Sequence, residues 1–269
     1  MLQTLLVYVL TGCAAGYLAG LFGVGGGIII VPVLVMLFKA SGISQEVFMP
    51  LAIGTSMSVV SVTSLMGARA HHANGNVDWG NAKALLPAIL AGVMAGSLLG
   101  AHAPRSVLGG LVVAFELCMS LMFITQVARS GQEDGSGNRE WPRSWMLVVS
   151  ALLGSVSSVV GIAGGTLFVP FLNFLGVNLR KAIGTATAMG APLSLVAAFV
   201  YMLAGSVGHK PLPPYSIGFI YLPAFLGCVV GGIWTTKHGA ALGLRLNLRM
   251  LKLAFALILL IAAGKMLFV

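Results

Sequence analysis

Long apolar runs separated by short polar stretches recur along the whole chain. Many of these runs approach the ~20 residues with which an α-helix crosses about 30 Å of hydrocarbon. Because a helix satisfies its own backbone hydrogen bonds where no water is available, the pattern predicts an all-α polytopic membrane protein. The predicted segments lie near residues 2–22, 26–38, 48–68, 83–101, 106–127, 144–160, 164–176, 182–204, 215–236 and 246–268.

Short sequence matches divide the ten segments into two sets of five. G-V-G-G-G-I-I-I-V-P ends at Pro32, and G-I-A-G-G-T-L-F-V-P ends at Pro170. A-I-G-T-S begins at Ala52, and A-I-G-T-A begins at Ala182. A third match, L-P-A, follows in both halves, so the matches come in one order. This order indicates an internal repeat, with short or broken helices at the glycine-rich turns.

The repeats are predicted to span residues 1–128 and 144–269, with a polar linker at 129–143. An odd number of segments makes the second repeat insert upside down, the inverted-repeat plan of many secondary transporters. With the amino terminus outside, eleven Lys and Arg residues fall on the inner side and four on the outer side. The positive-inside rule therefore predicts both termini outside. Whether the first two segments of each repeat cross the membrane or re-enter stays open, because they are short.

Composition excludes a soluble globular protein and several other classes. Mean hydropathy is +1.00, with 58% apolar and 8% charged residues, against about a quarter charged in soluble domains. The net charge of +9 comes from residues at segment ends, without the aromatic-interleaved patch of a nucleic-acid protein. Cys13, Cys118 and Cys228 lie in apolar runs at unrelated spacings, so no disulfide, metal site or cofactor is predicted. No phosphate-binding loop for ATP occurs.

The two glycine-rich turns are the first candidate for an anion site. Glycine allows positive φ and close approach of another group. A helix that begins after such a turn points free N–H groups and a partial positive charge toward it. The alternative is close helix packing through small residues. The candidate binding residues in these turns are Gly23, Gly25, Gly26, Gly27, Gly161, Gly164, Gly165 and Thr166.

Hydroxyl and amide side chains near these turns are the second candidate. G-T-S and G-T-A-T begin or lie within the third segment of each repeat. Their hydroxyls could donate to an anion without adding charge, or could bond back to their own helix. An amide in the short segment after the second turn could line the same site or link two helices. The candidates are Thr55, Ser56, Thr185, Thr187 and Asn173.

Glu116 is the only acidic residue within an apolar run. A carboxylate at membrane depth is costly and is a functional candidate by default, here for proton coupling. The corresponding position in the second repeat is Ala256. A protonated or hydrogen-bonded packing residue is therefore the alternative.

The G-V-G-G-G-x-x-x-V-P motif, its second copy and the paired G-T runs resemble the TauE/SafE sulfite exporter family, also called the TSUP permeases. The resemblance covers nearly the whole chain. It implies a bacterial inner-membrane permease that moves sulfite, sulfonates or related organosulfur anions without hydrolysing ATP. Its motif falls on the glycines of the two turns, although the second copy has Ala163 where the first has Gly25.

We therefore expect a secondary transporter that moves a small anion by alternating access between the two repeats. Its partners would be the anion and the lipid bilayer, and it would be no enzyme. An anion channel, or a membrane metal-handling protein or enzyme, is the alternative. The second of these would need clustered acidic, His or Cys side chains in the apolar core. Substrate, direction, coupling ion and oligomeric state, monomer or homodimer, stay open.

Overall fold

The fold is seen in a computed structural model of the 269-residue chain. It describes residues 2–22, 25–128, 141–162, 164–207, 211–243 and 248–267. The first half contains α1 (Leu2–Phe22), α2 (Gly27–Ala40), α3 (Phe48–Ala73), α4 (Trp79–His102) and α5 (Arg105–Ala128). The second contains α6 (Arg143–Val160), α7 (Gly165–Phe174), α8 (Leu179–Val207), the hairpin β1 (Ser216–Ile217) and β2 (Ile220–Tyr221), α9 (Leu222–Gly243) and α10 (Leu248–Leu267).

The predicted fold class, an all-α polytopic membrane protein, is confirmed. Within the described residues, six helices are long and apolar enough to cross a bilayer. The helices α2 and α7 are shorter, with 14 and 10 residues. At a rise of 1.5 Å per residue they span about 21 and 15 Å, less than the ~30 Å of the hydrocarbon core. Both therefore have the length of half-helices.

The ninth helix differs from the prediction. It begins at Leu222 rather than at residue 215, and the β1–β2 hairpin occupies the preceding residues. Tyr215 and Gly218 have positive φ angles of 66° and 53°, which a right-handed helix does not contain. Pro223 then lies in the first turn of α9, where a missing N–H costs nothing. Hydropathy alone did not distinguish this apolar hairpin from helix.

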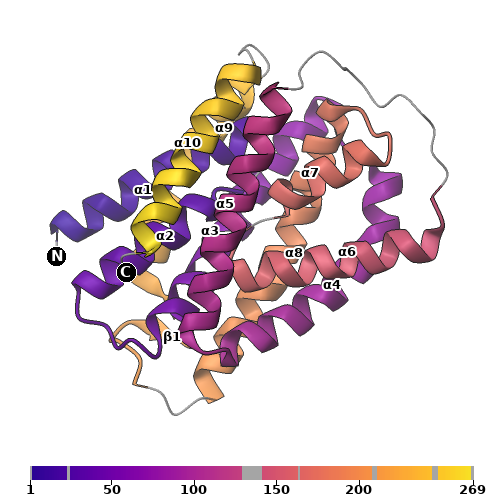
Figure 1. The fold of residues 1–269 in the computed structure, drawn as a ribbon. Helices are drawn as coiled ribbons and strands as arrows, with labels where there is room; N and C mark the ends of the chain where they lie inside the picture. Colours follow the sequence, from indigo (N-terminus) through magenta and orange to yellow (C-terminus); the bar gives the residue numbers. More distant parts are fainter. Residues whose placement is uncertain are drawn as a thin grey trace.

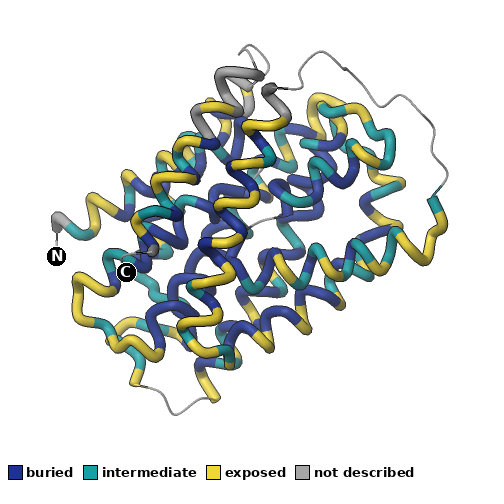
Figure 2. Tube along the Cα trace, viewed as in Figure 1, coloured by how far each residue is buried: buried dark blue, intermediate teal, exposed yellow. Residues whose placement is uncertain are grey.

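The centre of the molecule is the antiparallel pair of α3 and α8 (Figure 1). Its direction follows from close approaches at two points, Gly67 to Thr187 and Gly54 to Tyr201. Most of α3 is buried. Figure 2 shows buried residues concentrated in the interior and exposed ones along the outer faces. Large apolar side chains such as Leu99, Leu121 and Trp234 are exposed, as expected for a surface that faces lipid.

Four helix pairs account for the main packing, and each joins the two halves of the chain. They are α1 with α9, α4 with α6, α3 with α8, and α5 with α10. If the two halves are repeats, α1 corresponds to α6, α2 to α7, and so on to α5 and α10. Under this correspondence the α1–α9 pair is equivalent to the α6–α4 pair. The α3–α8 and α5–α10 pairs map onto themselves. The division into repeats at 1–128 and 144–269 stays a prediction, with which this pattern agrees.

Glycines bring the backbones together in two of these pairs. A Cβ atom at Gly16 of α1 would lie 2.5 Å from the carbonyl oxygen of Gly232 in α9. A Cβ atom at Gly154 of α6 would lie 2.6 Å from the carbonyl oxygen of Ile89 in α4. Without hydrophobic driving force between helices in lipid, such close approach supplies the dispersion contacts that hold them together.

Candidate functional site

The two glycine-rich turns meet each other inside the protein. A Cβ atom added to Gly27, the first residue of α2, would lie 2.5 Å from the carbonyl oxygen of Gly161 and 3.1 Å from Cα of Ile162. The hydroxyl of Ser56 on α3 donates to the same Gly161 carbonyl at 3.0 Å. The turns and the first half of α3 therefore form one buried contact region, which we call the turn junction.

The backbone of each turn explains its glycines. Gly25, Gly26 and Gly161 have φ angles of 76°, 77° and 81°, in the region that favours glycine. Gly26 also lies against α1, because a Cβ atom there would be 2.6 Å from the carbonyl oxygen of Ala15. Side chains at these positions would strain the backbone or displace the neighbouring helix.

The short helices α2 and α7 begin in the same way. The Gly26 carbonyl accepts from the N–H groups of Ile29 at 3.1 Å and Ile30 at 3.3 Å. In the second half, the Gly164 carbonyl accepts from Leu167 at 3.2 Å and Phe168 at 2.6 Å. These hydrogen bonds use the N–H groups of the third and fourth residues after each glycine. The N–H groups of the first two residues after each glycine are left for another acceptor.

Those first N–H groups belong to Gly27 and Ile28 in α2, and to Gly165 and Thr166 in α7. None of the four donates to a backbone or side-chain acceptor among the described residues. The Thr166 hydroxyl is also buried, with 1% of the residue exposed, and has no hydrogen-bond partner in the described part of the chain. Each helix start thus presents donors without a partner among the described residues and the positive end of a helix dipole, which together favour an anion.

The described residues around the turn junction include no buried Lys or Arg. No Lys or Arg is buried among the residues whose burial is described, and the buried polar side chains are mainly Ser and Thr. An anion held there would interact with N–H and O–H dipoles. In the same part of the chain, no three His, Cys, Asp or Glu side chains gather where they could hold a metal ion.

The predicted hydroxyl residues divide into two groups. Ser56 reaches the turn junction. Thr55 instead donates to the Leu51 carbonyl at 2.6 Å and accepts from the Tyr221 N–H at 2.9 Å. Thr185 accepts from the Asp78 N–H at 2.8 Å. The single hydroxyl proton of Thr55 is therefore already used, and both threonines contact loops of the other half.

Two further predicted residues bond within or near their own helix. The Thr187 hydroxyl donates to the Ile183 carbonyl at 2.7 Å. Asn173 donates to the Val177 carbonyl at 3.3 Å, at the end of α7 opposite Gly165. Eight residues of helix separate Asn173 from Gly165, about 12 Å at 1.5 Å each. Their roles in substrate binding stay predictions, and Gly23 lies outside the described residues.

Two residues at the turns were not predicted. The Thr63 hydroxyl of α3 contacts the Gly25 carbonyl at 3.3 Å, and the Ser157 hydroxyl of α6 donates to the Ile162 carbonyl. Thr63 lies in the same segment as the predicted G-T-S run, but the corresponding position on α8 is Leu193. Repetition between the halves was the signal used, and it could not reveal a residue present in one half alone.

Glu116 lies on α5 with 0% of the residue exposed. Neither of its carboxyl oxygens has a hydrogen-bond partner in the described part of the chain. The neighbouring Ser120 links α5 to α10 by donating to the Ala256 carbonyl at 3.0 Å. Burying a carboxyl group at membrane depth is costly, which makes it a functional candidate, and its role in proton coupling stays a prediction.

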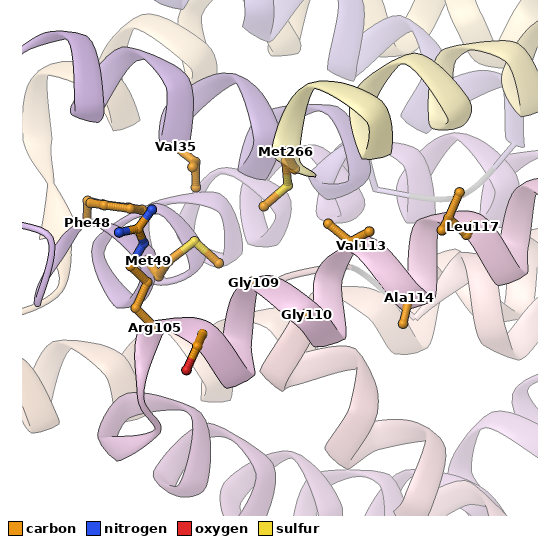
Figure 3. A pocket seen from close by; sticks show the side chains of 11 residues that line it. Val35, Phe48, Met49, Arg105, Gly109, Gly110, Val113, Ala114, Leu117 and Met266 are labelled. Atoms are coloured by element: carbon orange, nitrogen blue, oxygen red, sulfur yellow. The ribbon is translucent and has the colours of Figure 1, made fainter. Parts of the chain in front are cut away.

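A cavity of about 560 Å³ lies away from the turns, between α5, α10 and the adjoining ends of α2 and α3 (Figure 3). Its walls are mainly apolar, with Val35, Val113 and Met266 directed into it. Arg105 lies near its edge, 4.8 Å from the centre of the Phe48 ring, and donates to the Gln45 amide oxygen at 2.7 Å. None of the turn residues lines this cavity, so we do not assign the substrate to it.

Comparison with known proteins shows that the sequence matches a family of membrane transporters. The family model described as sulfite exporter TauE/SafE matches residues 8–266. A protein of Haemophilus influenzae named a probable membrane transporter protein is 34% identical over 99% of both chains. A probable membrane transporter protein of Methanocaldococcus jannaschii is 24% identical, over 93% of this chain and 91% of its own. No solved structure matches the chain.

Proposed function

We propose that this chain, which belongs to the TauE/SafE sulfite exporter family and is a multi-pass membrane transporter, moves a small oxyanion that binds at the turn junction. The substrate class is sulfite, a sulfonate or a related organosulfur anion. The observation that carries the proposal is the set of N–H donors at the starts of α2 and α7 that have no acceptor in the described part of the chain. Such donors bind an anion without the strong attraction of a buried cation, which suits reversible binding.

We further propose that transport proceeds by alternating access between two inverted repeats in a bacterial inner membrane. The helix pairs that map onto one another between the halves support the repeat. The distribution of eleven basic residues against four supports termini on the outer side. The half-helix lengths of α2 and α7 match the discontinuous helices that bind substrates in other secondary transporters.

Counterflow in proteoliposomes tests the proposed function. Vesicles containing the purified protein are loaded with unlabelled sulfite, taurine or sulfoacetate and placed in a trace of the labelled anion. A carrier concentrates the label transiently and saturates with substrate. Uptake that never saturates and shows no counterflow would indicate a channel, and no anion-specific flux from any of the three would refute the substrate class.

Replacing Thr166 by Val is expected to weaken substrate binding while retaining the fold. Valine has nearly the same shape but lacks the buried hydroxyl that has no partner in the described residues. A hydrogen bond to a charged group contributes about 1.5–3 kcal/mol, so the KM for the anion should rise about 10-fold or more. The measurement is the concentration dependence of counterflow.

The matched control is Thr11→Val. Thr11 is also a buried threonine, but its hydroxyl donates to the Val7 carbonyl of its own helix at 2.7 Å. Its KM should stay within twofold of the original. Equal KM values for the two variants would remove Thr166 from the binding site.

Replacing Glu116 by Gln is expected to abolish the response of transport to a pH gradient. Glutamine preserves the size of the side chain but cannot release a proton. Counterflow without a gradient should persist, because it needs no net proton movement. The measurement compares uptake with and without an imposed gradient in the same vesicles. An unchanged gradient response would identify Glu116 as a packing residue.

A further inference from the structure

In each half, an adjacent glycine and threonine, Gly54–Thr55 or Gly184–Thr185, contact a loop from the other half. On α3, the Thr55 hydroxyl accepts from the N–H of Tyr221, the last residue before α9, at 2.9 Å. A Cβ atom on the adjacent Gly54 would overlap the carbonyl oxygen of Phe219. The loop therefore lies directly against the backbone of α3, and glycine is what permits this. We call residues 219–221 with Gly54 and Thr55 the first latch.

The same arrangement recurs on α8. The Thr185 hydroxyl accepts from the N–H of Asp78, the last residue before α4, at 2.8 Å. A Cβ atom on the adjacent Gly184 would overlap the carbonyl oxygen of Asn76. In both halves the threonine binds the residue just before a helix, and the glycine contacts the residue two positions earlier. Residues 76–78 with Gly184 and Thr185 form the second latch.

Electrostatics add to the second latch. The Asp78 carboxylate accepts from the Asn81 N–H at 3.1 Å and so caps α4. Partial burial opposes the charged form of Asp78, but hydrogen bonds from Asn81 and Gly80 and the nearby charge of Lys181 outweigh it and lower the pKa. Lys181 precedes Gly184 by less than one helical turn on α8. Attraction between Lys181 and Asp78 therefore acts across the docked surfaces.

The latches lie at opposite ends of the antiparallel α3–α8 pair. The first contacts the beginning of α3 and also the end of α8, since a Cβ atom on Gly205 would overlap the Phe219 N–H nitrogen. The second follows the end of α3 and contacts the beginning of α8. Between them, α3 contacts the turns through Ser56 and Thr63. The contacts between α3 and the turns thus lie between the two latches along the α3–α8 pair.

We propose that the two latches are the gates of the transporter, and that they open alternately to opposite sides of the membrane. This inference rests on the alternating-access mechanism proposed above. It gives Thr55 and Thr185 a role in positioning the loops rather than in binding the anion. Each side-chain contact is a single neutral hydrogen bond, so a latch can open and close reversibly. Loop motions that expose and seal a site are a common device for such switching.

Accessibility of a cysteine at the turn junction tests the proposal without any substrate. The background carries alanine at the three native cysteines, and Ser56→Cys supplies the probe. Thr55→Val or Thr185→Val is then added, and a membrane-impermeant maleimide is applied to right-side-out and to inverted vesicles. Valine removes the acceptor but retains the shape. We expect labelling to rise about 10-fold from one side in Thr55→Val and from the other side in Thr185→Val.

Three further variants separate gating from general loosening. Thr236→Val is the matched control, because Thr236 is buried and its hydroxyl donates to the Gly232 carbonyl of its own helix at 2.7 Å. Its labelling should match that of the background. Thr55→Ser and Thr185→Ser retain the acceptor and should restore closure. Labelling from the same side in both valine variants, or no rise above Thr236→Val in folded protein, would overturn the proposal.

The outcome is independent of the substrate assignment. If none of the tested anions is transported but the labelling still switches sides, the latches are gates of a carrier whose substrate is another compound. If anions are transported with counterflow but the labelling pattern fails, the proposed function stands and the gates lie elsewhere. Folding of each variant is checked by size-exclusion chromatography and thermal unfolding before labelling.

Discussion

Alanine in place of Gly27 should lower transport about 100-fold while leaving the protein folded and inserted. The added Cβ atom would lie 2.5 Å from the Gly161 carbonyl oxygen and 3.2 Å from the Ser56 hydroxyl. The first of these atoms belongs to the backbone of the other turn, so the two turns must move apart. A displacement of about 1 Å at a reacting centre can lower a rate by ~100-fold, and we expect a loss of counterflow of similar size.

Gly109→Ala is the control for this prediction. Gly109 is also a helical glycine, on α5, and a Cβ atom there would meet nothing within 4 Å. Alanine also favours helix more than glycine does, by up to about 1 kcal/mol, so neither variant is disfavoured by helix propensity. Counterflow should remain near the original value in Gly109→Ala. Equal activity of the two variants would show that the contact between the turns is not needed for transport.

Alanine in place of Gly92 should markedly lower the stability of the folded protein. A Cβ atom there would overlap the Ala151 carbonyl oxygen of α6 and lie 2.9 Å from the Ala151 Cα atom. Both are backbone atoms, so the α4–α6 pair must separate as a whole. Overpacking of this kind costs about 1–3 kcal/mol, and the loss of close contacts between helices adds to it. Thermal unfolding in detergent should show a lower transition temperature.

Gly264→Ala on α10 provides the comparison, because a Cβ atom there has no neighbour within 4 Å. Its unfolding temperature should equal or exceed that of the original chain, since alanine is the better helix former. A Gly92→Ala protein as stable as Gly264→Ala would mean that α4 and α6 can move apart at little cost.

The helices were predictable from sequence because a segment that crosses the hydrocarbon core must be apolar over about 20 residues. Nine predicted segments overlap helices that begin within about four residues of the expected position, and this is the usual uncertainty of such boundaries. Only the start of the ninth segment was wrong, because the residues before α9 are about as apolar as the helix. Backbone angles at Tyr215 and Gly218 decide that turn, and hydropathy contains no information about them.

The candidate site was predictable only where it is repeated. The duplicated turns identified Gly26 and Gly164, and their helix starts share the same hydrogen-bond pattern. The duplicated G-T runs were also recognised, but their partners, the backbone N–H groups of Tyr221 and Asp78, lie far away in sequence. A long-range contact between a side chain and a backbone group leaves no mark in composition or spacing. The contacts of the threonines could therefore be found only in the structure.

The four main helix pairs have a consequence for the order in which the chain can fold. Since each pair joins the first half to the second, neither half contains the principal interfaces of its own interior. The molecule is in this sense a heterodimer whose subunits are covalently fused. The fusion raises the effective concentration of one half around the other, and glycines let the backbones of the two halves approach closely in the α1–α9 and α4–α6 pairs. A half that emerges first from the ribosome remains without its proper neighbours until the second half follows.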